Sequence, residues 1–144
     1  MAEYTTEMDW EAINKGVIAE FRENEGQCTG IFEGMPMCLI NTIGAKTGST
    51  RTKPLVYLEE GGRYCIFASF AGAPAHPPWY HNIVANPVFD FEVGKEKFQV
   101  RAEELAEPER TEIYNNQVAA MSIFGSYAEK AGPRVIPVFA LSRI

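Results

Sequence analysis

The sequence predicts an α+β fold that is mainly β: a closed or nearly closed small barrel of about six mostly antiparallel strands with flanking helices. Short apolar runs alternate with turn-rich segments, which is typical of hairpins, and helical patterns lie between the hairpins. No G-x-G-x-x-G motif follows a strand and opens a helix, so a Rossmann unit is not supported.

The expected elements follow from periodicity and from breaker residues. Apolar residues recur at helical spacing near the N-terminus and predict a helix over about 7–24, packed outside the barrel or acting as a lid. Helices are also expected at Trp79–Ala85, after two prolines, and at Glu107–Met121. The pattern over 122–132 is ambiguous between a loop and further helical turns. Strands are expected at Met37–Ile43, Leu55–Leu58, Tyr64–Ser69, Val88–Val93, Lys97–Leu105 and Val135–Leu141.

Length and composition indicate one globular domain over residues 1–144. The chain has a mass of 16.0 kDa, with 46% hydrophobic and 22% charged residues, which is ordinary for a domain with a packed core. Its three cysteines, Cys28, Cys38 and Cys65, are odd in number and lack C-x-x-C spacing. We therefore expect neither a disulfide framework nor a zinc site, and read the cysteines as reduced cytoplasmic thiols.

The charge balance limits the partners. The formal net charge is −6, and an acidic chain is a poor general binder of nucleic acid. No apolar run reaches the roughly 18–20 residues of a membrane span. The segment Met1–Trp10 carries three acids and no base, which excludes a secretory signal, so a cytoplasmic protein is expected. The N-terminal helix remains a candidate for peripheral membrane contact, with only Lys15 and Arg22 as bases.

The turn from Gly44 to Arg51 has the composition of an anion site. Its two glycines let the backbone approach a ligand closely and expose N–H groups. Lys46 and Arg51 add positive charge, and the hydroxyls of Thr47, Ser49 and Thr50 lie between them. A phosphate or carboxylate tail requires such groups, although a solvated hairpin turn has the same composition.

The segment from Gly72 to Asn82 combines prolines with aromatic residues. Trp79 and Tyr80 are suited to wall a flat heterocycle, and Asn82 to bind a ring carbonyl or cap the helix. The alternative is a packed loop with Trp79 as its apolar anchor. His76 and His81 are five residues apart, which is not a usual ligand spacing, so no metal site is expected. Without an evident nucleophile either, the chain has the character of a protein whose cofactor carries the chemistry.

An ordered series of short motifs runs through the second two thirds of the chain. The motifs are Gly44-Ala-Lys-Thr-Gly48 with Arg51, Pro54-Leu55, Gly61-Gly62, Ala68-Ser69, Gly72-Ala-Pro74, His76-Pro77, Trp79-Tyr80-His-Asn82, Ala85-Asn-Pro87 and Ile136-Pro-Val-Phe139. In this order and spacing they resemble the deazaflavin-dependent nitroreductase family, a branch of the flavin/deazaflavin oxidoreductases with a split β-barrel fold. The similarity extends from about Met37 to the C-terminus.

The resemblance implies an oxidoreductase that passes a hydride from a reduced 8-hydroxy-5-deazaflavin coenzyme (coenzyme F420) to a quinone, a nitroaromatic or an activated alkene such as an enone. It implies that the coenzyme phosphate and acidic tail are held by Lys46, Thr47, Gly48 and Arg51. It implies that the ring is lined by Pro54, Leu55, Ala68, Ser69, Trp79 and Asn82. Tyr127 matches a family tyrosine near the acceptor, and Tyr127 and Ser69 are the candidate proton donors.

Two departures from the family pattern leave alternatives open. Phe70 stands where relatives usually carry a lysine, which removes one positive charge from the tail site. Phe124 stands where relatives carry another tyrosine on the substrate side, which disfavours nitroimidazole-type reduction. The alternatives are an FMN-dependent split-barrel reductase and a non-catalytic protein that binds the coenzyme or an apolar ligand. Because split barrels often pair their sheet edges, a homodimer is a further expectation.

Overall fold

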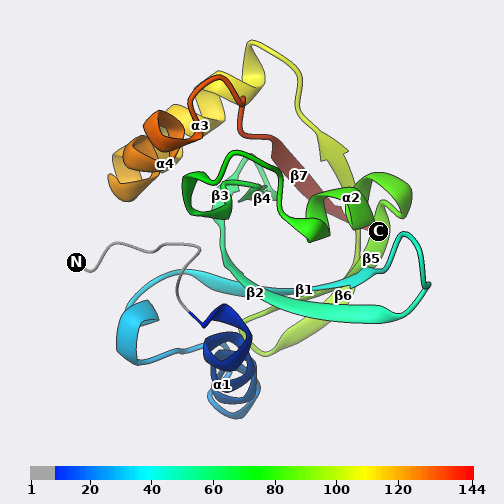
Figure 1. Cartoon of the computed structure of the whole chain (residues 1–144). Helices are drawn as coiled ribbons and strands as arrows, with labels where there is room; N and C mark the ends of the chain where they lie inside the picture. The colour runs from blue at the N-terminus through cyan, green and yellow to red at the C-terminus, as the bar shows by residue number, and fades with distance from the viewer. Residues whose placement is uncertain (1–8) are drawn as a thin grey trace.

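The sheet curls into a split barrel, which confirms the predicted mainly β fold (Figure 1). The structure is a computed structural model and describes residues 9–144. Each pair of neighbouring strands is antiparallel, in the order β2-β1-β5-β6-β7-β4-β3, so β2 and β3 are the two edges. The strands are β1 (Met37–Ile43), β2 (Thr50–Val56), β3 (Leu58–Glu60), β4 (Arg63–Phe67), β5 (Val88–Val93), β6 (Glu96–Glu104) and β7 (Val138–Arg143).

The predicted strand Leu55–Leu58 is in fact parts of two strands. The chain leaves one edge of the sheet after Val56 and joins the opposite edge at Leu58. Between them, the Tyr57 backbone N–H donates to the Pro36 carbonyl at 3.1 Å rather than to a strand partner. A continuous apolar run hides this crossing, because periodicity does not register a change of partner strand. The described part of the chain therefore forms seven strands, whereas the sequence predicted about six.

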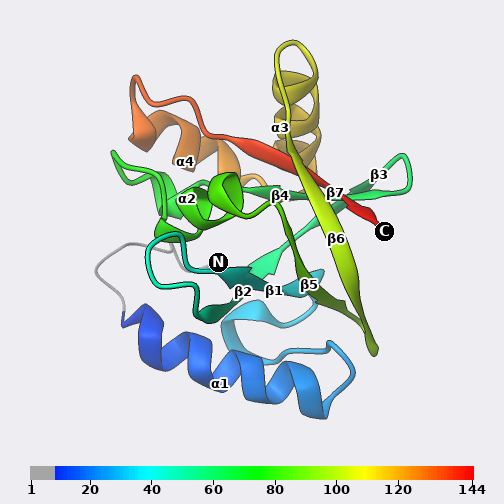
Figure 2. The ribbon, with the colours of Figure 1, turned by 90° about the vertical axis from the view of Figure 1, so that its right-hand side faces the viewer.

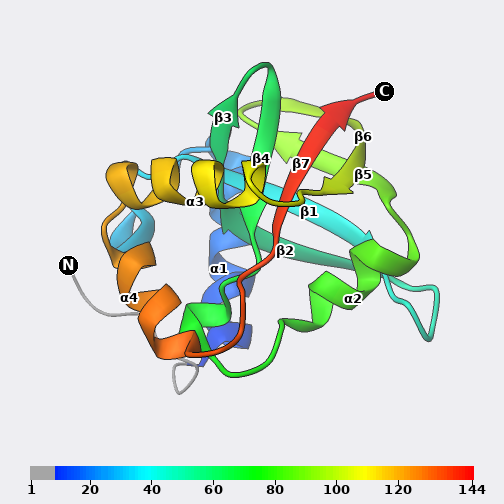
Figure 3. The ribbon, with the colours of Figure 1, turned by 90° about the horizontal axis from the view of Figure 1, so that it is seen from above.

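Four α-helices flank the sheet in the part of the chain that the structure describes (Figures 2 and 3). They are α1 (Trp10–Glu23), α2 (Pro78–Ala85), α3 (Glu109–Ala120) and α4 (Ile123–Ala131). The ambiguous segment over 122–132 thus forms a helix. Within the described residues the expected N-terminal helix runs from Trp10, and the Asp9 side chain caps it by accepting from the Ala12 N–H at 3.3 Å. Positions 7 and 8 lie outside the described residues.

Helix α1 packs against the outside of the barrel. Val17 and Phe21 are buried against Phe32 and Leu39, which places the apolar face of the helix toward the sheet. In Figures 1 and 2 this helix lies on the opposite side of the barrel from α3 and α4. Trp10 and Asn14, near the N-terminal end of the helix, line an apolar pocket.

An ion pair at the other end of α1 joins the helix to the sheet. The Arg22 guanidinium donates to the two Glu92 carboxylate oxygens at 3.2 and 2.8 Å, and the Asn41 amide donates to Glu92 at 3.0 Å. Burial raises the pKa of Glu92, but the hydrogen bonds from Arg22 and Asn41 outweigh it and leave the pKa below its ordinary value. Glu92 is therefore a buried carboxylate that depends on its donors.

We expect Arg22→Met to destabilise the protein by about 1–2 kcal/mol, because the Glu92 carboxylate then stays buried with one donor fewer. This loss of stability is smaller than for a fully buried ion pair, because the Arg22 side chain is 47% exposed and solvent partly screens its charge. Urea denaturation at neutral pH measures the loss. Arg101→Met on β6 is the control, since Arg101 is exposed. Equal stability of the two variants would contradict the anchoring role of Arg22.

Candidate functional site

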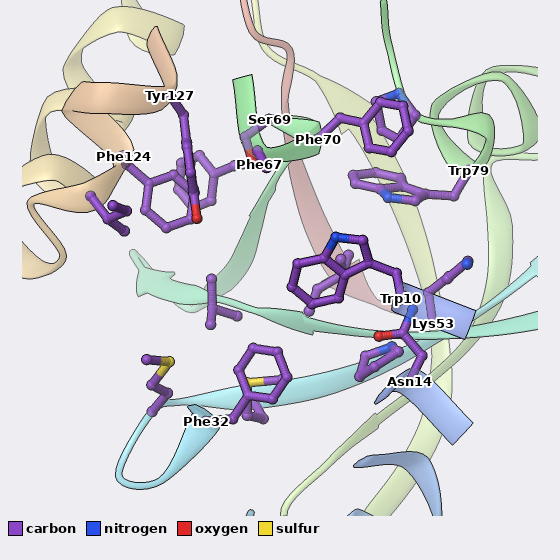
Figure 4. Close-up of a pocket in the computed structure, with 18 of the residues that line it drawn as sticks. Trp10, Asn14, Phe32, Lys53, Phe67, Ser69, Phe70, Trp79, Phe124 and Tyr127 are labelled. Atoms are coloured by element: carbon purple, nitrogen blue, oxygen red, sulfur yellow. The ribbon is translucent and has the colours of Figure 1, made fainter. Parts of the chain in front are cut away.

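An apolar pocket of about 200 Å³ lies where β2, α1, α2, α4 and the segment after β4 meet. In Figure 4, Tyr127 and Phe124 line one side, Trp79 and Phe70 the opposite side, and Trp10 lies between them on the α1 side. Among the described residues, the side-chain polar groups of the lining, indoles apart, are those of Asn14, Lys53, Ser69 and Tyr127. A mostly apolar cavity with a few placed polar groups is the usual form of a small-molecule site.

The floor of the pocket is formed by β2. Pro54 has no N–H to donate, and its place in an edge strand, paired only with Leu39 of β1, leaves no strand hydrogen bond missing. Pro54 is buried and Leu55 half-buried, and both line the pocket. Lys53 precedes them and brings a cation to the pocket rim.

The wall after β4 has an unusual backbone. Phe70, Ala71 and Gly72 all have positive φ, at 49°, 51° and 79°. Left-handed conformations are costly for residues with a Cβ, and runs of them are found mainly where surrounding structure enforces them. This turn presents Ser69, Phe70 and Ala71 to the pocket.

Helix α2 connects the pocket to the turn between β1 and β2. Trp79 is 6% exposed, lines the pocket and packs on Phe139 with ring centroids 6.3 Å apart. Asn82, one helical turn later on the same face, accepts from the Ala45 N–H at 3.0 Å. The Asn82 side chain, for which the sequence predicted binding of a ring carbonyl or capping of the helix, thus holds the Gly44–Arg51 turn in the structure.

The turn itself is compact and presents its bases to solvent. The Gly44 N–H donates to the Ser49 carbonyl at 2.8 Å, and the Gly48 N–H donates to the Gly44 carbonyl at 2.9 Å. A Cβ on Gly44 would come within 2.8 Å of the Thr47 hydroxyl and 3.3 Å of the Ser49 carbonyl oxygen, so a side chain at this position would displace the Thr47 side chain. Lys46 and Arg51 are exposed on this closed loop.

Helix α4 supplies the remaining side of the pocket. Phe124 and Tyr127 are both buried, with ring centroids 5.2 Å apart in an edge-to-face arrangement. In Figure 4 the Tyr127 hydroxyl points toward the pocket. Behind them, the Tyr114 hydroxyl donates to the Phe124 carbonyl at 2.6 Å, and burial raises the pKa of Tyr114 to about 12. Tyr114 is thus neutral, and its hydrogen bond holds the first turn of α4.

The structure sorts the predicted site residues into three groups. Those that line the pocket are Pro54, Leu55, Ser69, Trp79 and Tyr127. Those on the exposed turn are Lys46, Thr47, Gly48 and Arg51. The Asn82 side chain is joined to this turn by the hydrogen bond that it accepts from the Ala45 N–H. Ala68 is fully buried behind the pocket wall, where its N–H donates to the Pro137 carbonyl at 2.9 Å.

Sequence reasoning missed several residues of the site. Trp10 and Asn14 of α1 line the pocket, and so does Lys53. Arg134, between α4 and β7, braces the pocket wall through backbone contacts. A cation next to the Pro54-Leu55 motif was a local signal for Lys53, whereas no local pattern announces Arg134 or Trp10.

Within residues 9–144 no cluster of three or more His, Cys, Asp or Glu side chains is arranged to hold a metal ion. His76 and His81 lie among aromatic rings, and the ring centroids of His76 and Tyr80 are 4.4 Å apart. Of the helices that the structure describes, none has both the length and the apolar character of a bilayer span.

Comparison with known proteins identifies the family of the chain. The model of the family described as F420H(2)-dependent quinone reductase matches residues 14–143. The chain belongs to this family. The F420H(2)-dependent quinone reductase Rv1261c of Mycobacterium tuberculosis is 37% identical over 112 residues, which cover 75% of this chain and 74% of the relative. Family membership makes the protein an oxidoreductase that uses reduced F420, as the resemblance implied, and the family name selects the quinone among the three implied acceptor classes.

Solved structures agree with this assignment. A structure of an F420-H2 dependent reductase (FDR-A) matches with a TM-score of 0.68 at 38% identity. The match covers 74% of the present chain and 94% of the FDR-A chain. Another structure, described as a domain-swapped dimer, has a TM-score of 0.70 at 34% identity, and the match covers 93% of the present chain and 98% of the other. The heme storage protein HutZ of Vibrio cholerae, at 12% identity and TM-score 0.58, shows the shared fold alone.

Proposed function

We propose that this reductase binds the deazaflavin ring in the pocket of Figure 4 and the coenzyme tail at the turn Gly44–Arg51. The observation that carries the proposal is the connection through α2: one face of this helix places Trp79 in the pocket and Asn82 on the turn. A ligand with a flat apolar head and an anionic tail would contact both.

The residues fit such a ligand. Trp79 and Pro54 offer apolar surfaces against which a planar ring can stack. Exposed Lys46 and Arg51 offer the charge and the planar fork that a phosphate or carboxylate prefers. Neither group of residues alone defines the cofactor, but an apolar slot beside a basic turn on an acidic chain matches an anionic coenzyme.

When bound, reduced F420 supplies the hydride. The chain's own part is to orient the acceptor, exclude water and deliver a proton. The apolar side chains around the pocket exclude water, and Phe124 and Met121 are placed to pack on a quinone ring. The Tyr127 hydroxyl and the Ser69 hydroxyl are the proposed proton donors to the reduced acceptor oxygen.

The two departures from the family pattern support a quinone as the acceptor in this proposal. Phe124 is buried, 5.7 Å from Phe67 and 5.2 Å from Tyr127 between ring centroids, so it supplies apolar contact in place of a hydroxyl. Phe70 is 39% exposed at the pocket rim and supplies no charge, which leaves Lys53 to bring a cation to the lining. A pocket of this character suits an apolar quinone better than a nitroimidazole.

The decisive experiment titrates the purified protein with reduced F420 and, separately, with FMN, and then adds menadione. We expect selective binding of F420 and reoxidation faster than the protein-free rate. Binding without turnover on a quinone series would favour a carrier protein. Selective binding of FMN would show that Phe70 marks a change of cofactor, and binding of neither would contradict the proposal.

Replacing Tyr127 by Phe tests the proposed proton donor. We expect kcat with menadione to fall at least about 10-fold while the Kd for reduced F420 stays unchanged, because only a hydroxyl is lost. Stopped-flow measurement of coenzyme reoxidation separates the two quantities. Tyr57→Phe is the matched control, since Tyr57 lies outside the pocket lining. An unchanged kcat in Tyr127→Phe would assign the proton to Ser69 or to solvent.

Self-association is a further part of the proposal. Among residues 9–144, the edge strands β2 and β3 each have a strand partner on one side alone, and such an edge is a site for pairing with another chain. The relative described as a domain-swapped dimer supports a dimer here as well. Light scattering after size exclusion should give a mass near twice 16.0 kDa, and a monomer mass would exclude this part.

A further inference from the structure

Arg134 is a half-buried arginine whose contacts are mostly main-chain carbonyls. Its guanidinium donates to the Ala68 carbonyl at 3.1 Å, to Ser69 at 2.7 Å and to Ala73 at 2.9 Å. The fourth partner is the Nδ1 atom of His76, 2.9 Å away. An arginine fork with five donors can satisfy several acceptors that converge on one point.

The three carbonyls converge because the chain between them reverses through the left-handed turn. Ala68 and Ser69 precede the run of positive φ at positions 70–72, and Ala73 follows it. Two backbone hydrogen bonds close the loop internally, from the Gly72 N–H to the Ser69 carbonyl at 2.9 Å and from the Ala73 N–H to the Phe70 carbonyl at 3.0 Å. Arg134 thus joins both ends of a strained turn that presents Ser69 and Phe70 to the pocket.

The contact with His76 requires a neutral imidazole. Every guanidinium nitrogen is a donor, so Nδ1 must be the acceptor and the proton must sit on Nε2. The charged or titratable groups around His76 are Arg134, His81 and Tyr80 of α2, and Glu104 of β6, whose carboxylate already accepts from the Tyr80 hydroxyl at 3.0 Å. A proton on Nδ1 would remove the acceptor and place two cations in contact.

We propose that Arg134 is the positioning residue of the pocket wall at residues 69–71, and that neutral His76 completes its binding site, so that acid loosens this wall. The inference rests on the proposed function only for its effect on ligand affinity. The effect on the wall itself is independent of any ligand. Arg134 acts on the pocket through the backbone and touches no reacting atom.

The direction of the pH effect follows from the surroundings of His76. Burial first, and then the positive charge of Arg134, hold its pKa below the ordinary 6.5, with His81 adding to this and Glu104 opposing it. A depressed pKa means that the neutral form is favoured in the folded protein. The order it brings to the wall is complete above pH of about 6.5 and is lost as the pH falls through the folded pKa.

The ligand-free test follows amide hydrogen exchange of Gly72 and Ala73, corrected for intrinsic rates, at about pH 7.5 and pH 5. We expect protection to fall about 5-fold or more at the lower pH in wild type and to change less than about 2-fold in His76→Asn, whose Oδ1 accepts without titrating. His81→Asn is the control and should behave like wild type. Equal pH responses of wild type and His76→Asn would overturn the inference.

Arg134→Lys tests the fork directly. Lysine keeps the charge but cannot reach several carbonyls at once, so Gly72 and Ala73 should lose protection at neutral pH while circular dichroism stays unchanged. Arg101→Lys, at an exposed position, should change nothing. Full protection in Arg134→Lys would also overturn the inference.

The third test measures the Kd for reduced F420 at about pH 5 and at about pH 7.5. We expect the ratio of the first Kd to the second to be at least about 3-fold larger in wild type than in His76→Asn. Titration of the coenzyme itself affects both proteins equally and cancels in this comparison. If wild type binds no F420, the proposed function fails while the exchange measurements still decide the inference.

Discussion

Gly72→Ala is expected to destabilise the protein by about 3 kcal/mol and to lower Tm by roughly 10 °C. Gly72 has a φ of +79°, where an alanine is strained, and its added Cβ would lie 2.7 Å from the Lys130 Cβ and 2.9 Å from the Tyr127 carbonyl oxygen. Both contacts are on α4 near its backbone, so neither can rotate away. Because α4 carries Tyr127 and Phe124, we also expect activity to fall more than stability alone explains.

Gly62→Ala is the matched control for this substitution. Gly62 has a φ of +80°, nearly the same as that of Gly72, but a Cβ there would meet nothing within 4 Å. It therefore measures the backbone strain by itself, expected at about 1 kcal/mol. Thermal unfolding of both variants separates strain from the clash with α4. Equal losses in the two proteins would show that the wall can move away from α4 freely.

Replacing Lys46 and Arg51 together by alanine should weaken binding of reduced F420 about 100-fold. Each charge-assisted contact to an anionic tail is worth about 1.5 kcal/mol or more, and two of them give roughly this factor. The fold should be stable to within about 0.5 kcal/mol, because both side chains are exposed on a turn that the backbone and Asn82 hold. Fluorescence titration measures the Kd, and wild-type affinity should fall with salt more steeply than that of the variant.

The control is Lys95→Ala with Lys97→Ala, which removes the same charge from the exposed hairpin between β5 and β6. We expect its affinity for F420 to stay within about 2-fold of wild type, since a distant exposed charge is screened. If both double variants weaken binding equally, the general charge of the protein is responsible. If neither does, the tail does not lie at the turn.

The sequence carried the local information about this protein. Hairpins, the helix after Pro77 and the turn chemistry of Gly44–Arg51 depend on neighbours in the chain, and each has a composition that specifies it. The ordered motifs carried the family, because their order and spacing along the chain resemble those of its members. Cofactor class and fold class were thus predictable without a structure, and so was the grouping of Pro54, Leu55 and Trp79 around one pocket.

Only the tertiary structure could decide what depends on chain crossings and long-range contacts. The step from β2 to β3 across the split in the barrel left no periodic signal, and Trp10 and Asn14 reach the pocket because an ion pair from Arg22 and buried apolar side chains fix α1. The role of Arg134 was equally hidden, since its acceptors are carbonyl groups about 60 residues away, and every residue has a carbonyl. Side-chain patterns specify local structure, whereas backbone acceptors become distinct only when the fold brings them together.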